Sequence, residues 1–474
     1  MITGKVLKGR GWKEGRIIGL AKMAAHALEH TGATEPEVLE RLDEVLATPE
    51  KFSTVKPFED LAAEILRRNR NETSKVADTL REEPLDYRTW GAEGIDSGAI
   101  QQMRHAMSLP IAVAGALMPD AHVGYGLPIG GVLATADTVI PYAVGVDIAC
   151  RMRISIYDCS PNILGQHKGK FEKSLTEQTK FGMKERFSPR DRPDHPILED
   201  EDWNATKFLK PLRFKAIEQL GTSGGGNHFV EWGEFTLDSD SKDFGLSKGT
   251  YLALLSHSGS RAVGFKIANE YSRLAMNLHP QLDQVVRHLA WLDLDADPGR
   301  EYWLSMELAG RFAAANHAVI HSRVSKAAGV KEVAHVENHH NFAWKETMLD
   351  GSEAVVHRKG ATPAGEGVLG IIPGSMADPG YVVRGLGNGE SLNSASHGAG
   401  RKMGRKQAIN SLTKLERDRY LQERGVKLLG GGLDEAPQAY KNIDEVLAAQ
   451  SDLVQVVGKF IPRIVRMADE AGYD

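Results

Sequence analysis

The sequence has little cysteine, with only two such residues among 474. Two cysteines cannot supply the disulfide framework of a small secreted domain, so the expected compartment is the cytoplasm. No apolar run reaches the roughly 18 residues of a membrane-spanning helix, and no membrane partner is expected. The first residues, MITGKVLKGRGWKEGR, also lack the apolar core of a secretory signal.

Neither sign of charge dominates the sequence. It holds 58 lysines and arginines against 63 aspartates and glutamates, and its formal net charge is −5. This balance argues against a protein that coats nucleic acid through a generally basic surface. It leaves room for a local basic cleft.

The length indicates more than one structural unit. Residues 1–85 are expected to form a small helical unit of unknown role, because apolar residues recur there at helical spacing and Thr34 with Glu37 makes a capping box. Residues 86–474 interleave short β-branched runs with long helical stretches and show no regular βαβ period, which predicts an α+β fold. Residues 160–202, rich in Lys, Arg, Asp and Pro, are expected to form a surface insertion or mobile loop.

Four of the 17 histidines share one context, among glycines or small polar residues at the end of an apolar run. They are His228, His257, His340 and His397. Together with Asp147 and Cys150 they make a set of metal ligands, and a thiolate can bridge two divalent ions. No CxxC pair occurs, so the ligands have to converge from separate loops, which suits a catalytic site better than a structural one. The ligand types alone favour zinc.

Glycine-rich segments are a second recurring feature of the sequence, beside the histidines. The segments GTSGGGNH, IIPGSMADPG, RGLGNGES and SHGAGRKMGR expose backbone N–H groups of the kind that bind phosphates. None of them is a Walker loop. Beside a set of metal ligands, they indicate phosphoryl or nucleotidyl transfer.

These segments resemble one family. MPDAHVGYGLPIG, VGVDIAC, GGGNHFVE, SHSGSR, GIIPGSM and SHGAGR occur in this order in the RtcB family of RNA ligases, and the resemblance covers roughly residues 87–460. It implies mixed sheets with surrounding helices around a deep metal and nucleotide cleft. It also implies an enzyme that joins RNA 3′-phosphate or 2′,3′-cyclic phosphate ends to 5′-hydroxyl ends, using GTP and two Mn²⁺ ions. An activating partner protein is compatible with the resemblance.

The resemblance assigns roles to individual residues. It makes Cys150 the thiolate that bridges both ions and His397 the nucleophile that becomes guanylylated. The other metal ligands are Asp147, His228, His257 and His340. The nucleotide contacts are Asn227, Glu231, Ser375, Arg401 and Tyr440, and the phosphate or RNA contacts are Arg261 and Lys359.

Three positions depart from the family pattern. No lysine follows Lys459, where the family has a guanine-reading lysine near its end, and Arg463 or Arg466 is the expected substitute. Gly380 and Arg151 stand where serine and glycine are usual. These departures remove neither a ligand nor the nucleophile.

Two other functions stay open. The same ligands would serve a binuclear metallohydrolase of phosphate esters that forms no covalent histidine intermediate. A non-catalytic RNA-end-binding paralogue is the third hypothesis. The remaining cysteine, Cys159, is expected to be a packing residue, and His288, His317 and His321 to be surface or satisfied core residues.

Overall fold

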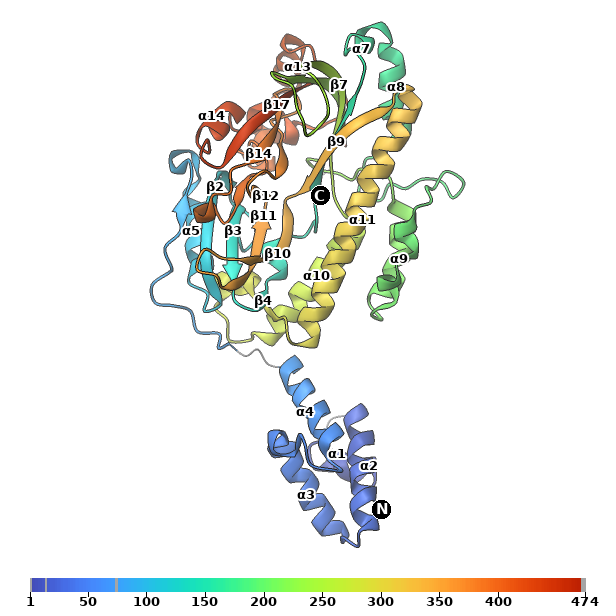
Figure 1. Cartoon of the computed structure of the whole chain (residues 1–474), viewed down its shortest axis with the longest axis vertical. Coiled ribbons are helices and arrows are strands. Elements are labelled where there is room, and N and C mark those ends of the chain that lie inside the picture. Colours follow the sequence, from blue (N-terminus) through green and yellow to red (C-terminus); the bar gives the residue numbers. More distant parts are fainter. Residues whose placement is uncertain (1, 13–14, 73–75, 470–474) are drawn as a thin grey trace. The chain divides into compact units, whose positions relative to one another are not determined.

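The structure of the chain is a computed structural model that describes residues 2–12, 15–72 and 76–469 (Figure 1). It divides into a small unit, made chiefly of Met1–Ala77, and a large unit that starts at Asp78. The sequence places this boundary at residue 85. Residues 78–85 instead belong to the large unit, because the N–H of Arg81 donates to Ser108 O and that of Leu85 to Met107 O.

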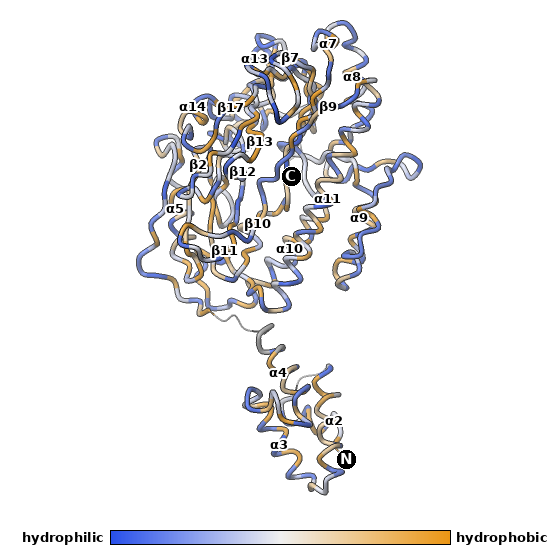
Figure 2. Tube along the Cα trace, in the orientation of Figure 1, coloured by the Kyte–Doolittle hydropathy of each residue, from blue (hydrophilic) through white to orange (hydrophobic). Residues whose placement is uncertain are grey.

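The small unit is helical. Its helices are α1 (Gly4–Gly9), α2 (Arg16–His30), α3 (Glu35–Ala47), the 3₁₀ turn η1 (Pro49–Phe52) and α4 (Glu59–Glu72). Figure 2 shows hydrophobic and hydrophilic residues alternating along α2 and α3, as expected for helices with one apolar face. These faces bury a core of their own around Leu7, Leu42 and Phe58.

Two sheets form the centre of the large unit. The five-stranded sheet has the order β1-β2-β3-β11-β10, and the larger sheet has the order β13-β14-β17-β6-β7-β5-β9, with β16 on β17. The strands are β1 (Arg88–Thr89), β2 (Ala112–His122), β3 (Ile129–Thr135), β5 (Arg151–Tyr157), β6 (Phe229–Leu237), β7 (Gly249–Ser258), β9 (Glu332–His339), β10 (Asn341–Thr347), β11 (Glu353–Lys359), β13 (Leu369–Ile372), β14 (Gly380–Gly385), β16 (Lys427–Leu429) and β17 (Val454–Met467). Two short pairs, β4 (Thr138–Val139) with β8 (Leu292–Asp293) and β12 (Ala361–Pro363) with β15 (Ser394–Ser396), complete the strands.

Helices cover these sheets. They are α5 (Ser97–Met107), α6 (Pro141–Val144), α7 (Ile163–Gln166), α8 (Lys168–Gln178), α9 (Leu209–Gln219), α10 (Arg261–Leu278), α11 (Asp297–Ala328), α12 (Arg405–Ser411), α13 (Lys414–Glu423) and α14 (Ile443–Ala448). The longest, α11, runs along the larger sheet (Figure 1). Ile320 and Val324 of α11 share a core cluster with Tyr157 and Leu254 of the sheet.

The segment 160–202 differs from the expected surface insertion or mobile loop. It contains α7, α8 and the 3₁₀ turn Pro196–Glu199, and a second 3₁₀ turn, Glu201–Asn204, begins at its end. Phe171 of this segment packs edge-on against Trp232 of β6 with ring centroids 5.1 Å apart. Phe187 of the segment is buried as well. The segment is therefore part of the hydrophobic core as well as of the surface.

The fold class predicted from the sequence, α+β, is confirmed. Mixed sheets lie at the centre and helices surround them (Figure 1). Within the residues that the structure describes, no helix is long and apolar enough to cross a membrane.

Candidate metal and nucleotide site

The predicted ligands lie at neighbouring strand ends of the larger sheet. Cys150 directly precedes β5, His228 directly precedes β6, and His257 lies near the end of β7. Strand β5 pairs with β7 in a register that places Met152 opposite His257, and β6 pairs with β7 so that Phe229 is also opposite His257. The pairing of these strands therefore gathers side chains that are more than 100 positions apart in the sequence.

Their ligand atoms lie close together. Cys150 Sγ is 3.1 Å from His257 Nε2 and 3.5 Å from His228 Nε2. His340 Nε2 lies 3.2 Å from His257 Nε2, and Asp147 Oδ2 lies 3.0 Å from His228 Nε2. Two groups result, Cys150–His257–His340 and Asp147–Cys150–His228, and within each group the ligand atoms lie within 4.8 Å of one another. Cys150 belongs to both groups, as a thiolate shared by two cations would require.

Backbone carbonyls fix the protonation of two imidazoles. His228 Nδ1 lies 2.7 Å from Ser223 O, and His257 Nδ1 lies 3.1 Å from Asn227 O. A carbonyl oxygen only accepts, so Nδ1 carries the proton in both rings. In a neutral ring the Nε2 lone pair is then free and faces the cluster. This arrangement is typical of histidine metal ligands.

The electrostatics of the cluster suit a cation. Burial and neighbouring histidines lower the pKa of His257 to about 3 and that of His340 well below its ordinary value, so both rings are neutral. Burial and the charge of Asp147 raise the pKa of the Cys150 thiol well above its usual value. Burial raises the pKa of Asp147, but the neighbouring side chains, among them His228 and Arg261, act against burial and the net shift is downward. A divalent cation can be bound by such a set of groups, which comprises neutral imidazoles, a carboxylate and a thiol that ionises only beside positive charge.

Glycine permits the close approach of these groups. A Cβ on Gly224, whose φ is +98°, would lie 2.1 Å from Arg261 Nη1 and 2.6 Å from His228 Nδ1. A Cβ on Gly259 would lie 2.2 Å from Asp147 Oδ1. Two non-glycine residues beside the ligands, Ala149 and Arg261, also adopt a positive φ of 57°. Such conformations cost free energy and concentrate at functional sites.

Arg261 lies at the edge of the cluster. Its Nε donates to Thr222 Oγ1 at 3.1 Å and its Nη2 donates to Gly182 O at 2.9 Å. The side chain is buried, and burial lowers its pKa although the charge of Asp147 acts in the opposite direction. The guanidinium is therefore held in one orientation, with Nη1 beside Gly224.

The predicted nucleophile, His397, follows β15. Its Nδ1 lies 2.7 Å from Asp120 Oδ2, and the same oxygen accepts the backbone N–H groups of His397 and Gly398 at 3.1 and 3.3 Å. Its ring centroid is 4.9 Å from that of His340, so His397 adjoins the metal-ligand cluster. A carboxylate on Nδ1 places the proton there and leaves Nε2 with a free lone pair.

Sequence analysis did not identify Asp120 as a functional residue. It is fully buried near the end of β2, inside the quoted segment MPDAHVGYGLPIG. The available signal was a carboxylate that breaks an apolar run close to a strand end. Burying such a group is costly unless it is hydrogen-bonded, and its three N–H donors belong to the segment of the nucleophile.

Three of the predicted nucleotide contacts lie around the same region. Glu231 is buried in β6, and burial raises its pKa well above the ordinary value. Asn227 lies beside His228 and its carbonyl binds His257. Ser375 donates to Asp378 Oδ2 at 2.5 Å, and its loop meets the loop of His397 because Ala399 N donates to Pro373 O.

Arg401 and Tyr440 form a second cluster with Glu435. Arg401 Nη1 lies 3.2 Å from Tyr440 Oη and 3.3 Å from Glu435 Oε2. Arg405 also pairs with Glu435, and its Nη2 would lie 3.4 Å from a Cβ on Gly226. Arg405, which sequence analysis did not single out, therefore links this cluster to the glycine loop that precedes His228.

Lys359 ends β11 and is buried beside His397. Its Nζ donates to Tyr125 O, and a Cβ on the next residue, Gly360, would lie 3.1 Å from His397 Cε1. Burial lowers the pKa of Lys359 to about 7. The two arginines expected to replace the missing lysine are engaged elsewhere, Arg463 with Glu234 and Arg466 with Leu429 O.

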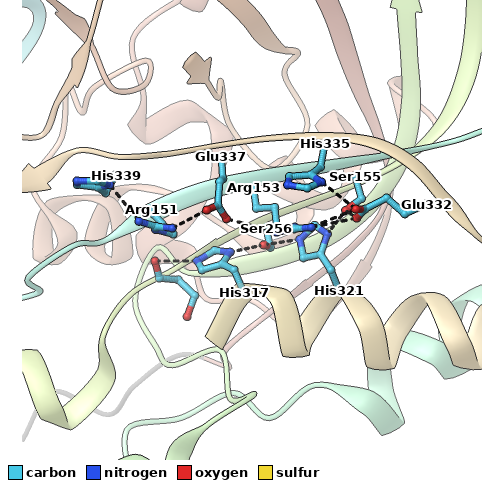
Figure 3. A network of polar contacts seen from close by, with 11 residues as sticks. Arg151, Arg153, Ser155, Ser256, His317, His321, Glu332, His335, Glu337 and His339 are labelled. Carbon is cyan, nitrogen blue, oxygen red and sulfur yellow. Dashed lines mark hydrogen bonds and ion pairs between the residues drawn. The ribbon is translucent and has the colours of Figure 1, made fainter. Parts of the chain in front are cut away.

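Arg151 follows Cys150 at a position where glycine is usual in the family. Its side chain takes part in a polar network between β5, β9 and α11 (Figure 3). It donates to Glu337 Oε1 at 2.9 Å and contacts His339 Nδ1 at 3.0 Å. Glu337 also pairs with Arg153, which is the next residue on the same face of β5. The charge of Arg151 is thus balanced by Glu337.

Known proteins match this chain over most of its length. The family model described as "tRNA-splicing ligase RtcB" matches residues 102–468. The RNA-splicing ligase RtcB of Escherichia coli strain K12 is 31% identical over 405 residues, covering 80% of this chain and 96% of that protein. The tRNA-splicing ligase RtcB of Nanoarchaeum equitans is 32% identical over 434 residues, covering 76% of this chain and 90% of that protein.

These relatives define a class, that of splicing ligases that act on RNA. The chain belongs to the RtcB family of RNA ligases, which confirms the resemblance found in its sequence. The match begins at residue 102, so the small N-terminal unit lies outside it.

Proposed function

We propose that this protein joins RNA 3′-phosphate or 2′,3′-cyclic phosphate ends to 5′-hydroxyl ends, using GTP, two Mn²⁺ ions and a guanylyl-histidine on His397. The observation that carries the proposal is the position of His397 beside two ligand groups that share Cys150. A metallohydrolase requires the two ligand groups. It does not require a further imidazole outside them, such as that of His397, whose Nδ1 contacts Asp120.

The ligand set would hold the cations as follows. Cys150 would bind both ions, His257 and His340 would complete one group, and Asp147 and His228 the other. When bound, the cations supply positive charge that offsets the charge of the phosphates. The sulfur and imidazole ligands alone also suit zinc, and manganese is the ion that the family resemblance implies.

His397 would perform the first transfer. Its Nε2 attacks the α-phosphorus of GTP, so that an N–P bond forms and the bond to pyrophosphate breaks. The imidazole gains positive charge in this step, and the Asp120 carboxylate on Nδ1 stabilises it. No proton has to leave Nε2, because the neutral ring presents a lone pair there.

Two further transfers would complete the reaction. An oxygen of the RNA 3′-phosphate attacks the phosphorus of guanylyl-His397, and the N–P bond breaks. The 5′-hydroxyl of the second RNA end then attacks the RNA phosphorus, its proton passes to solvent, and GMP leaves. A 2′,3′-cyclic phosphate first takes up water, which breaks its bond to O2′ and gives the 3′-phosphate. Arg261 and Lys359 are the proposed phosphate contacts, and bidentate geometry suits Arg261 to this task.

We assign the guanine and ribose contacts to five residues around the cluster. They are Asn227, Glu231, Ser375, Arg401 and Tyr440. Glu231 is the candidate for the guanine edge, because a buried carboxyl can bind the N–H groups of that base. The Tyr440 ring, with Arg401 5.1 Å from its centroid, offers a flat surface for stacking.

Incubation with α-labelled GTP and manganese, followed by a denaturing gel, tests the proposal. Wild-type protein should retain the label and His397→Ala should not. Asp120→Asn should fold normally and label roughly 100-fold more slowly, because the amide does not stabilise the charge that develops on the ring.

The alternative functions predict other results. A metallohydrolase would cleave phosphate esters without retaining label, and His397→Ala would leave its rate unchanged. A protein that only binds RNA ends would show neither labelling nor hydrolysis. Label that persists in His397→Ala would also reject the proposed nucleophile.

A further inference from the structure

A basic segment, residues 180–192, is fastened to the loop that carries His228. Ser223 N donates to Lys180 O at 2.8 Å, and Gly182 N donates to Gly224 O at 2.7 Å. Gly182 O accepts the Arg261 guanidinium, and Gln219 Nε2 donates to Met183 O at 3.2 Å. The segment therefore keeps a fixed position against the metal-ligand loop and the proposed phosphate contact.

Phe187 anchors the middle of the segment. Its ring is buried, and the guanidinium carbon of Arg323 lies 4.2 Å from its centroid. The residues on either side of this anchor point outward. Met183 is 67% exposed, and Lys184 and Arg190 are exposed as well.

The charge of the segment opposes that of the whole chain. Residues 180–192 hold five basic and two acidic residues, whereas the protein has a net charge of −5. Arg186 is paired with Glu218 at 3.0 Å. Lys184 and Arg190 make neither an ion pair nor a side-chain hydrogen bond within residues 2–12, 15–72 and 76–469. Two exposed cations close to the site are thus not engaged in an ion pair with any described residue.

We propose that residues 183–190 bind the sugar–phosphate backbone of the RNA strand whose end occupies the site, with Lys184 and Arg190 contacting phosphates. This inference rests on the proposed function. Because Arg261 contacts Gly182, an RNA end held by Arg261 lies within reach of the segment. Met183 offers an adaptable apolar surface on which a ribose or base can pack. Contacts of this kind are independent of RNA sequence and weaken with salt.

GTP also carries phosphates, and one experiment distinguishes RNA binding from GTP binding by these cations. In Lys184→Glu/Arg190→Glu, self-guanylylation from GTP should proceed at the wild-type rate. Affinity for a single-stranded RNA 3′-phosphate of about ten nucleotides should fall by about tenfold or more at 0.1 M salt. The slope of log affinity against log salt should become shallower by about 1.4, that is, about 0.7 for each lost phosphate contact.

The chain offers a matched control. Lys242 and Lys248 are exposed in the loop between β6 and β7, and β7 runs from the end of this loop to His257 near its other end. Lys242→Glu/Lys248→Glu changes the net charge by the same amount far from the site. It should leave RNA affinity near the wild-type value. Lys184→Arg/Arg190→Lys should keep both the affinity and the salt slope.

The outcomes decide between the claims. Unchanged RNA affinity and salt slope in the double glutamate variant would overturn the inference, and so would an equal loss in the distant control. Loss of guanylylation in the variant would assign the segment to GTP and would also overturn it. If the wild-type protein takes no label, the proposed function fails, and RNA binding by the same set of variants still decides whether the segment contacts RNA.

Discussion

Cys150 is the one residue that both ligand groups contain, whereas His340 belongs to one group only. We therefore expect alanine substitutions of Cys150 and His340 to leave different numbers of bound metal ions per chain. Cys150→Ala should bind neither ion firmly and should lose guanylylation, while His340→Ala should retain about one ion per chain. Elemental analysis after dialysis against manganese, together with the labelling assay, measures both.

Retention of two ions per chain by Cys150→Ala would show that the sulfur does not bridge them. Cys159→Ser serves as the matched control. This second cysteine is half-buried in the cluster around Trp232 and Ile320, away from the ligand groups. Its replacement should leave both the metal content and the labelling rate unchanged.

Lys359 gives the site a pH dependence near neutrality. Burial lowers its pKa from 10.5 to about 7, so at pH 8 the amine is mostly neutral. A phosphate bound beside it favours the charged form, so GTP binding at pH 8 should take up a proton. Calorimetry in buffers of different ionisation enthalpy should detect this uptake in the wild type and not in Lys359→Met.

The same shift affects stability with a defined sign. The folded pKa lies below the unfolded value, so the unfolded chain binds more protons between about pH 7 and 10.5. The free-energy cost of burying this amine is fully present below pH 7. The free energy of unfolding therefore rises as the pH increases from about 7 to 10.5. In Lys359→Met this increment should be missing from the pH dependence of unfolding.

At the scale of elements, the location of the site residues at strand ends explains which of them can be predicted from the sequence. The proposed metal ligands and His397 can be predicted from the sequence because the histidines share a context of glycines or small polar residues and because the segments around these residues resemble those of one family. Asp120 and Arg405 lie in quoted segments, MPDAHVGYGLPIG and SHGAGRKMGR, but sequence analysis does not single them out, because only tertiary contacts give them partners near the site. Residues 160–202 differ from the expectation because their charged composition conceals the buried Phe171 and Phe187.

The polar network between β5, β9 and α11 holds two strands that carry ligands (Figure 3). Arg153 pairs with Glu332 at 3.2 Å and with Glu337 at 3.3 Å. The guanidinium is nearly buried while both carboxylates are about 30% exposed. Arg153→Met should therefore lower the free energy of unfolding by about 2 kcal/mol, less than a fully buried pair would cost.

Urea denaturation measures this loss, and a double-mutant cycle assigns it. If the ion pair is responsible, Glu332→Gln should cost less in the Arg153→Met background than in the wild type. Additive effects would instead mean that lost packing explains the change. Metal content should remain at the wild-type value in both variants, because neither residue is a ligand.

The whole molecule consists of two units with separate cores, and the small unit lies outside the family match. All the residues proposed for metal binding, nucleotide binding and catalysis belong to the large unit. A chain that starts at Asp78 should therefore fold and take up label from GTP at a rate within about twofold of the full-length protein. Loss of labelling in a truncated chain with normal circular dichroism would assign the small unit a part in guanylylation.

The proposed metal ligands come from separate strands, so a bound cation would also stabilise the sheet. An ion held by residues next to β5, β6 and β7 and in the β9–β10 turn would add a further connection between these strands, and an ion that binds only the folded state raises its melting temperature. The helical unit has none of these ligands, so in a calorimetric scan it provides an internal reference. Adding manganese should raise the melting temperature of the large unit and leave that of the helical unit unchanged.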